Sequence, residues 1–203
     1  MKLYEFGPTR SLRVRWVLQE LDVPFECVQV DLAKGEGRTR GFLKLNPTGK
    51  LPVLVDGEHV ITESVGIALY LAEKYRDKRL MPAELHDRGQ VYRWLFFVVT
   101  ELEQPLWRMA RHTFLYPPVD RSPAEIALAA RDFLGMARVF EAHMTGRPFV
   151  VGDRVSVVDF IAAATLDWAD GEKLLGDFPA LTRYMTRMYE RPRRAPRIAE
   201  VSS

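Results

Sequence analysis

The sequence contains a single cysteine, Cys27, among its 203 residues. An intramolecular disulfide, a Cys-x-x-Cys dithiol and a cysteine zinc cluster are therefore all excluded. Scarcity of cysteine is typical of proteins from a reducing compartment, so we expect a cytoplasmic protein. Cys27 falls in a valine-rich run of strand character, where the expected role is that of a buried small apolar side chain.

Long apolar runs and an excess of one charge are also missing. No run approaches the roughly 20 apolar residues that a membrane-spanning helix needs, and the first residues lack the apolar core of a signal peptide. The 29 basic and 27 acidic residues leave a formal net charge of +2, which does not suggest a nucleic-acid partner. No cluster of metal ligands is visible, and the arginines at 191–197 are interpreted as a solvated tail.

The first 75 residues alternate between strand and helix patterns. Residues 2–6 and 25–31 alternate like strands, and an apolar stripe with helical spacing lies between them, after Ser11. A short helix is expected at 40–45. The remaining elements are strands at 51–55 and 58–61, joined by the hairpin signal Asp56-Gly57, and a helix from Glu63 to Tyr75. The predicted order is β-α-β-α-β-β-α.

Beyond the polar segment that follows, strand alternation disappears. Helical patterns occupy residues 86–113, 123–144, 157–168 and 179–190, which predicts an all-helical domain. Ser156 and Asp159 have the spacing of a capping box at the start of the third of these helices. The expected fold is thus α/β plus all-α, with a first domain at 1–77, a linker at 78–88 and a helical bundle domain at 89–203.

Three segments carry a resemblance to the cytosolic glutathione transferases. They are NPTGKLPVL at 46–54, ESVGIALYL at 63–71, and the stretch 152–159 with its Ser-x-x-Asp cap. Their order and the β-α-β-α-β-β-α plan match the family, in its bacterial type, over nearly the whole chain, without indicating a class. The resemblance implies a thioredoxin-like first domain, a homodimer, and glutathione as a cosubstrate with no permanently bound cofactor.

The resemblance places part of glutathione beside the segment 50–53. In the family, the residue that matches Pro52 follows a cis peptide bond, which would expose the backbone next to it. Glutathione's cysteinyl unit would then pair with Val53 as a short added strand, with Leu51 alongside. The alternative is that Leu-Pro-Val only begins an edge strand. Lys50 is a candidate for holding the glycyl carboxylate, or is simply a solvated lysine.

The start of the helix at 63–75 is the second half of the implied glutathione site. A helix N-terminus favours an anion through its backbone N–H groups and its dipole. By resemblance, the γ-glutamyl carboxylate is expected at Ser64 and the γ-glutamyl amino group near Glu63. The alternative is that Ser64 is only the N-cap of the helix, and both roles are compatible.

The residue that activates the thiol should lie in the turn at 6–11, since the family carries a tyrosine, serine or cysteine there. This turn has no cysteine, and Tyr4 lies inside the strand, where a structural role is expected. Thr9 and Ser11 remain as hydroxyl donors, although Ser11 is equally a candidate N-cap. Arg10 occupies the position of the family's cysteine and adds positive charge that favours a thiolate. The backbone N–H groups of the turn are a further alternative.

The family's pocket for the second substrate is lined by the first long helix of the helical domain. Here the matching candidates are Trp107, Arg108, Arg111 and Tyr116, which would form a partly apolar and partly cationic wall. The alternative is a place in the core or at a dimer interface. Pro105 should kink this helix or mark a break in it.

Three functions are therefore weighed. The first is attack of the activated glutathione thiol on a small electrophilic substrate. The second is glutathione-dependent reduction of a disulfide or peroxide. The third is a non-catalytic interaction module on the same fold. No partner beyond glutathione, the electrophile and a second copy of the chain is expected, and neither a nucleic acid nor a membrane is among them.

Overall fold

A computed structural model of the chain describes residues 1–201 and divides into two compact units. The first unit comprises Met1–Met81 together with the segment from Tyr189 onward, and the second comprises Pro82–Met188. The predicted linker at 78–88 contains both the division between the units and the first residues of a helix. None of the helices in the described part of the chain is long and apolar enough to cross a membrane.

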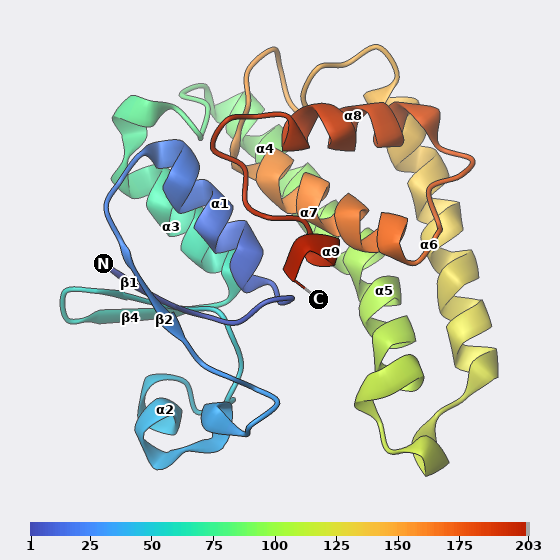
Figure 1. The fold of residues 1–203 in the computed structure, drawn as a ribbon. Helices are drawn as coiled ribbons and strands as arrows, with labels where there is room; N and C mark the ends of the chain where they lie inside the picture. The colour runs from blue at the N-terminus through green and yellow to red at the C-terminus, as the bar shows by residue number, and fades with distance from the viewer. Residues whose placement is uncertain (202–203) are drawn as a thin grey trace. The chain divides into compact units, whose positions relative to one another are not determined.

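The first unit is built on a four-stranded sheet in the order β2-β1-β3-β4. Strand β1 (Lys2–Glu5) runs parallel to β2 (Glu26–Gln29) and antiparallel to β3 (Val53–Asp56), which forms a hairpin with β4 (His59–Thr62). Helices α1 (Ser11–Leu21) and α3 (Ser64–Lys74) lie on one face, and α2 (Arg40–Leu45) lies on the other (Figure 1). This arrangement confirms the predicted thioredoxin-like plan, with strand ends shifted by one or two residues.

Apolar side chains fill both faces of this sheet. Trp16, Leu18 and Leu21 of α1 have no exposed surface. On the other face, Phe42 of α2 packs in a cluster with Val30 and Val53. Tyr4 adjoins that cluster, with its ring centroid 6.1 Å from that of Phe42, which confirms its expected structural role.

Cys27 does not have the buried position that its sequence context suggested. Strand β2 is at the edge of the sheet, where Cys27 lies opposite Leu3 on one side only. Its side chain is exposed, as are those of Glu26 and Gln29. The expectation failed because a valine-rich run does not reveal whether its strand lies inside a sheet or at its edge.

The residues described in the second unit form helices joined by loops, with no strand. Its main helices are α4 (Leu85–Phe97), α5 (Glu103–Ala110), α6 (Pro123–Met144), α7 (Val157–Gly171) and α8 (Pro179–Tyr189). A π-helical turn, Val98–Leu102, joins α4 to α5, and a second one, Arg111–Leu115, follows α5. Pro105 has no backbone N–H and cannot donate the helical hydrogen bond at its position. The π-helical turn just before it changes the hydrogen-bonding pattern, so the helix continues where a break was expected.

Asp159 organises the start of α7 from a fully buried position. Its carboxylate accepts hydrogen bonds from the backbone N–H (2.8 Å) and hydroxyl (3.1 Å) of Ser156, which confirms the predicted capping box. It also accepts from the Val150 N–H at 2.9 Å and the Tyr184 hydroxyl at 2.8 Å. Burial raises the pKa of the Asp159 carboxyl, and these donors oppose that shift.

The C-terminal segment packs with the first unit, whereas we expected a solvated tail within the helical domain. Arg191 forms an ion pair with Glu20 of α1, and Arg193 lies 2.8 Å from Asp22 at the end of that helix. The Tyr189 ring centroid is 4.6 Å from that of Trp16. The last described helix, α9 (Ile198–Val201), reaches the turn after β1, where a Cβ added to Gly7 would lie 3.1 Å from Val201 Cβ. Acidic residues at the C-terminal end of α1 therefore pair with Arg191 and Arg193, whereas Arg194 pairs with Glu200 of the same segment.

Candidate functional site

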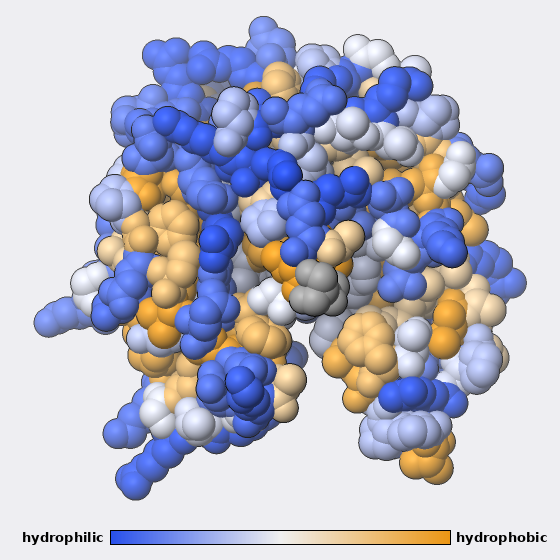
Figure 2. All heavy atoms as spheres, viewed as in Figure 1, coloured by the Kyte–Doolittle hydropathy of each residue, from blue (hydrophilic) through white to orange (hydrophobic). Residues whose placement is uncertain are grey.

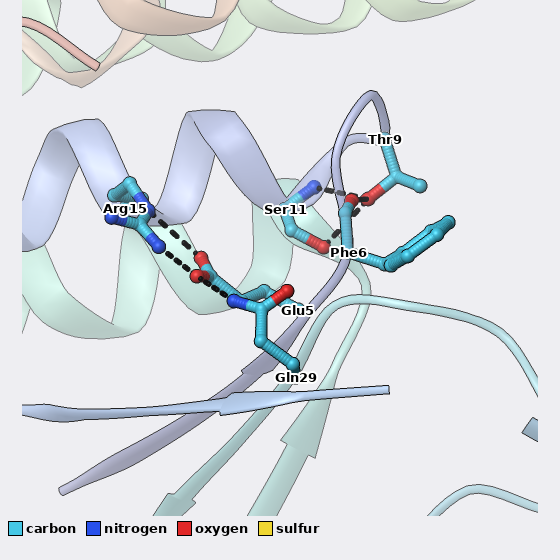
Figure 3. Close-up of polar contacts among 6 residues, drawn as sticks. All are labelled: Glu5, Phe6, Thr9, Ser11, Arg15 and Gln29. Atoms are coloured by element: carbon cyan, nitrogen blue, oxygen red, sulfur yellow. Dashed lines mark hydrogen bonds and ion pairs between the residues drawn. The ribbon is translucent and has the colours of Figure 1, made fainter. Parts of the chain in front are cut away.

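The turn between β1 and α1 contains a short chain of hydroxyl groups (Figure 3). The Thr9 hydroxyl donates to the Phe6 carbonyl at 2.5 Å, and its oxygen lies 2.7 Å from the Ser11 hydroxyl oxygen. The Ser11 backbone N–H also donates to Thr9 Oγ1, at 3.2 Å. Because Thr9 gives its only hydroxyl proton to Phe6, the Ser11 hydroxyl must be the donor of the bond that the two share.

Two of the candidate activating residues therefore differ in their access to a ligand. Ser11 is completely buried, and its proton is given to Thr9. Thr9 and Arg10 are half-buried. The expectation that Ser11 caps α1 is wrong, because Ser11 is the first helical residue and Arg10 occupies the N-cap position, where its side chain forms no capping hydrogen bond. Thr9 is thus the hydroxyl with the better access to solvent.

A charged pair that the sequence did not reveal lies beneath this turn. Glu5 ends β1, and its carboxylate accepts from both Nε (2.9 Å) and the terminal nitrogen of Arg15 on α1 (Figure 3). The Gln29 side-chain amide of β2 donates to the same carboxylate at 2.8 Å. The only signal in the sequence was an acidic residue inside an otherwise apolar strand pattern. These contacts join β1, α1 and β2 just before the turn.

The peptide bond between Leu51 and Pro52 is cis, as the resemblance implied, and the bond between Gly7 and Pro8 is also cis. Val53 lies opposite Tyr4 of β1 on one side and Thr62 of β4 on the other. Strand β3 is therefore inside the sheet, and the alternative of an edge strand is wrong. Neighbouring strands flank Val53 on both sides, and Leu51 precedes the first paired residue of β3.

Asn46 holds the loop that leads to this segment. Its side-chain amide donates to the Lys50 carbonyl at 2.8 Å, while Oδ1 accepts from the Thr48 N–H (3.1 Å) and hydroxyl (2.9 Å). Gly49 has a φ of +69°, and a Cβ there would lie only 2.8 Å from the Gly37 carbonyl oxygen, so the position requires glycine. Lys50 is exposed at the end of this loop.

The start of α3 combines backbone strain with an uncapped helix end. Glu63 has φ 66° and ψ 113°, a conformation that costs a non-glycine residue about 1–3 kcal/mol and is typical of functional sites. Glu63 is the N-cap but makes no capping hydrogen bond through its side chain. Ser64 is therefore the first helical residue and not the N-cap.

The Ser64 side chain adds a buried polar group to that helix end. As a residue, Ser64 is only 5% exposed. A serine at the N-terminus of a helix, where the first backbone N–H groups have no intrahelical partner, is suited to an anionic ligand.

The candidates for the second-substrate pocket make different contacts within the second unit. The Arg108 guanidinium pairs with Asp132 and lies 3.9 Å from the Glu125 carboxylate, both on α6. The Trp107 ring packs edge-on against Trp168, with centroids 6.5 Å apart. Arg111 donates to the Tyr116 hydroxyl and lies 4.8 Å from the centroid of its ring. Arg111 and Tyr116 are therefore in contact with each other.

The segment that carries Arg111 and Tyr116 also exposes apolar side chains. Figure 2 shows apolar residues at the lower tip of the α5–α6 hairpin, and hydrophilic residues over α8. The exposed apolar residues of that tip are Phe114, Leu115 and Val119. The segment thus has the mixed apolar and cationic character expected from its sequence. Among the residues that the structure describes, no group of three or more His, Cys, Asp or Glu side chains is arranged to hold a metal.

Comparisons with known proteins agree with this geometry. Residues 1–73 match the family model described as glutathione S-transferase, N-terminal domain, and residues 104–192 match its C-terminal domain. Glutathione S-transferase F9 of Arabidopsis thaliana is 34% identical over 178 residues, covering 84% of this chain and 82% of that protein. A zeta-class glutathione S-transferase of Euphorbia esula is 36% identical, covering 78% and 71%.

Two solved structures illustrate the similarity of fold. Ure2p in complex with glutathione superposes with a TM-score of 0.87 at 20% identity, covering 98% of this chain and 96% of that one. A possible glutathione S-transferase from Rhodopseudomonas palustris superposes with a TM-score of 0.84 at 27% identity, covering 96% and 88%.

Proposed function

Because the chain belongs to the glutathione S-transferase family, we propose that it binds glutathione in its first unit and activates the thiol for attack on small electrophiles. The observation that carries this proposal is the start of α3, where the strained Glu63 provides no side-chain cap and precedes the largely buried Ser64. Strain of this kind costs stability and is typical of positions that bind a ligand.

Glutathione is assigned to the site group by group. The γ-glutamyl carboxylate accepts from the first N–H groups of α3 and from the Ser64 hydroxyl, and the Glu63 carboxylate receives the amino group. The cysteinyl backbone pairs with Leu51 and not with Val53, because strands already lie on both sides of Val53. Pro52 fixes the direction of that segment, and the exposed Lys50 receives the glycyl carboxylate.

Thr9 is the proposed donor to the thiolate. A free thiol has a pKa near 8.5, so only a few per cent is ionised at pH 7. When the sulfur binds, the Thr9 hydroxyl turns from the Phe6 carbonyl to the sulfur, and Ser11 continues to donate to Thr9, which strengthens the Thr9 donor. Arg10 adds positive charge nearby. The thiol proton passes to solvent, sulfur forms a bond to the electrophilic carbon, and the leaving group departs with its electron pair.

The second-substrate wall is assigned to Arg111 and Tyr116, with Trp107 as an apolar neighbour and Arg108 as an anchor to α6. A cationic and apolar wall suits an electron-poor or anionic substrate. The proposal includes a homodimer and a cytoplasmic location. Reduction of a disulfide or peroxide would use the same glutathione site, so the nature of the product separates it from transfer to an electrophile.

Isothermal titration with reduced glutathione tests the proposal directly. We expect Ser64→Ala to weaken binding about tenfold, as for the loss of one charge-assisted hydrogen bond. Ser122→Ala is the matched control, because Ser122 caps α6 in the second unit through its hydroxyl. The control should bind like the wild type. Absence of binding by the wild-type chain would overturn the proposal, and product analysis with an aryl halide and with a disulfide would follow binding.

A further inference from the structure

A pocket lies within the helical unit, and none of its lining residues is assigned to glutathione. It has a volume of about 310 Å³ and sits where α4 begins, α6 ends and the loop to α7 starts (Figure 1). Gln90, Arg93 and Trp94 of α4 line it, together with His143 of α6 and with Arg147 and Val150 of the loop. Three elements therefore contribute polar groups to one cavity.

Positive charge dominates the lining of this pocket. Arg93 donates to the Gln90 side-chain oxygen at 3.3 Å and lies 4.8 Å from the Trp94 ring centroid. Within residues 1–201, neither Arg93 nor Arg147 forms an ion pair, and the one lining carboxylate, Asp87, forms none either. Two exposed guanidinium groups thus share a pocket with a single acidic residue, and neither guanidinium is held by an ion pair in the described chain.

His143 lines the same pocket, and two contacts hold its ring. Its ring stacks on Trp94 with centroids 3.9 Å apart, and its Nε2 lies 2.8 Å from the Val150 carbonyl oxygen. A carbonyl only accepts, so Nε2 carries the proton and the neutral ring keeps its lone pair on Nδ1. Burial lowers the pKa of His143, and the charges of Arg147 and Arg93 lower it further, while the bond to Val150 opposes both. Both arginines therefore act on one imidazole.

We propose that this pocket binds a small oxyanion, a phosphate or carboxylate group, between Arg93 and Arg147. Guanidinium groups present forked donors that match the oxygens of such anions. A bound anion also supplies the counterion that neither arginine has within the described chain. Because it offsets the positive charge that acts on His143, its binding raises the pKa of that imidazole.

The test uses the full chain and needs no glutathione, so it is independent of the function proposed above. Inorganic phosphate and acetate are titrated separately, at constant ionic strength set with chloride, while NMR follows the imidazole signals. The chain has four histidines, and those at 59, 86 and 112 serve as internal references. The titration measures the influence on His143 of the charged residues that line the pocket, which are Asp87, Arg93 and Arg147.

We expect one of the two anions to shift the His143 signals in a saturable way and to raise its pKa. Arg147→Gln should weaken this binding about tenfold, and adding Arg93→Gln should abolish the pKa change. Arg154→Gln is the matched control, since Arg154 is exposed in the same loop but does not line the pocket. Arg147 is exposed, so its variant will fold.

The comparison between the two anions identifies the ligand chemistry. Stronger binding of phosphate assigns a phosphate group, and stronger binding of acetate assigns a carboxylate. The proposal is overturned if chloride alone reproduces the shifts, if neither anion moves His143, or if Arg147→Gln and Arg154→Gln behave alike.

Discussion

The Glu5 carboxylate and the Arg15 guanidinium form a two-pronged ion pair that joins the end of β1 to α1. The Glu5 side chain is only 4% exposed, whereas that of Arg15 is 27% exposed. The turn at residues 6–11 leaves β1 just after Glu5 and enters α1 one turn before Arg15. The pair therefore sets where Thr9 and Ser11 lie, although neither of its members is assigned to a substrate.

The first prediction concerns the asymmetry of that pair. Arg15→Gln should lower the free energy of unfolding by about 3 kcal/mol, because it leaves a buried carboxylate without its cation. Glu5→Gln should cost about 1 kcal/mol, since the remaining Arg15 can be hydrated. Urea unfolding measures both values. If Glu5→Gln lowers the free energy of unfolding more than Arg15→Gln does, the difference in side-chain exposure does not determine which substitution is more destabilising.

The second prediction separates Thr9 from Ser11. Thr9→Val should lower kcat/KM for a glutathione conjugation about 100-fold at neutral pH, as for the loss of one donor to a developing anion. The apparent pKa in the pH profile should rise toward that of a free thiol. Thr9→Ser keeps the hydroxyl and should restore the profile, and Ser11→Ala should change it less. If the pH profile shifts in Ser11→Ala but not in Thr9→Val, the donor to the thiolate is Ser11.

The third prediction uses the positive φ of Glu63. Glu63→Gly removes the strain and should raise the free energy of unfolding by about 1 kcal/mol, yet weaken glutathione binding because the carboxylate is lost. Glu63→Gln keeps the strain, so it should weaken binding without adding stability. Thermal or urea unfolding and calorimetric titration of both variants check this. Equal stabilities of the two variants would contradict it.

The fourth prediction concerns acid stability through Asp56. The Lys74 ammonium, and then the Tyr70 hydroxyl at 2.7 Å, lower the pKa of the Asp56 carboxyl in the folded chain. A lowered folded pKa gives stability that is complete above the unfolded value of about 3.9 and is lost as pH falls through the folded value. Asp56→Asn should therefore be less stable than the wild type at neutral pH.

The two proteins should converge in stability as the pH falls below that unfolded value. Unfolding midpoints in urea, measured from neutral to strongly acidic pH, give the comparison. A constant difference between wild type and Asp56→Asn across this range would show that the carboxyl does not titrate as described.

Elements with a strong local signal could be predicted from the sequence. The hairpin at Asp56-Gly57 and the capping box of Ser156 and Asp159 depend on residues within a few positions of each other, and both are present in the structure. Helix α2 was placed at 40–45 from its pattern alone. Local propensity, capping and turn chemistry are sufficient to predict a feature where the contacting residues are close to each other in the sequence.

Features that depend on distant contacts could not be predicted in this way. The bond between Arg191 and Glu20 spans 171 positions, so the C-terminal arginines looked like a solvated tail. The exposure of Cys27 depends on which strand lies at the sheet edge. The order of donors from Ser11 to Thr9 to Phe6 depends on the shape of a turn, which residue types alone do not fix. The glutathione assignments at 50–53 and 63–64 stay predictions.

The first unit is discontinuous along the chain, because its last segment begins at Tyr189, after the whole of Pro82–Met188. During synthesis, residues 1–81 leave the ribosome before roughly a hundred residues of the second unit have been made. At typical elongation rates, this delay lasts about 5–20 s. In that interval Glu20, Asp22 and the surface around Gly7 lack the partners that Arg191, Arg193 and Val201 later supply. A nascent first unit is thus incomplete until translation is nearly finished, and a chain stopped after the helical unit would leave it permanently so.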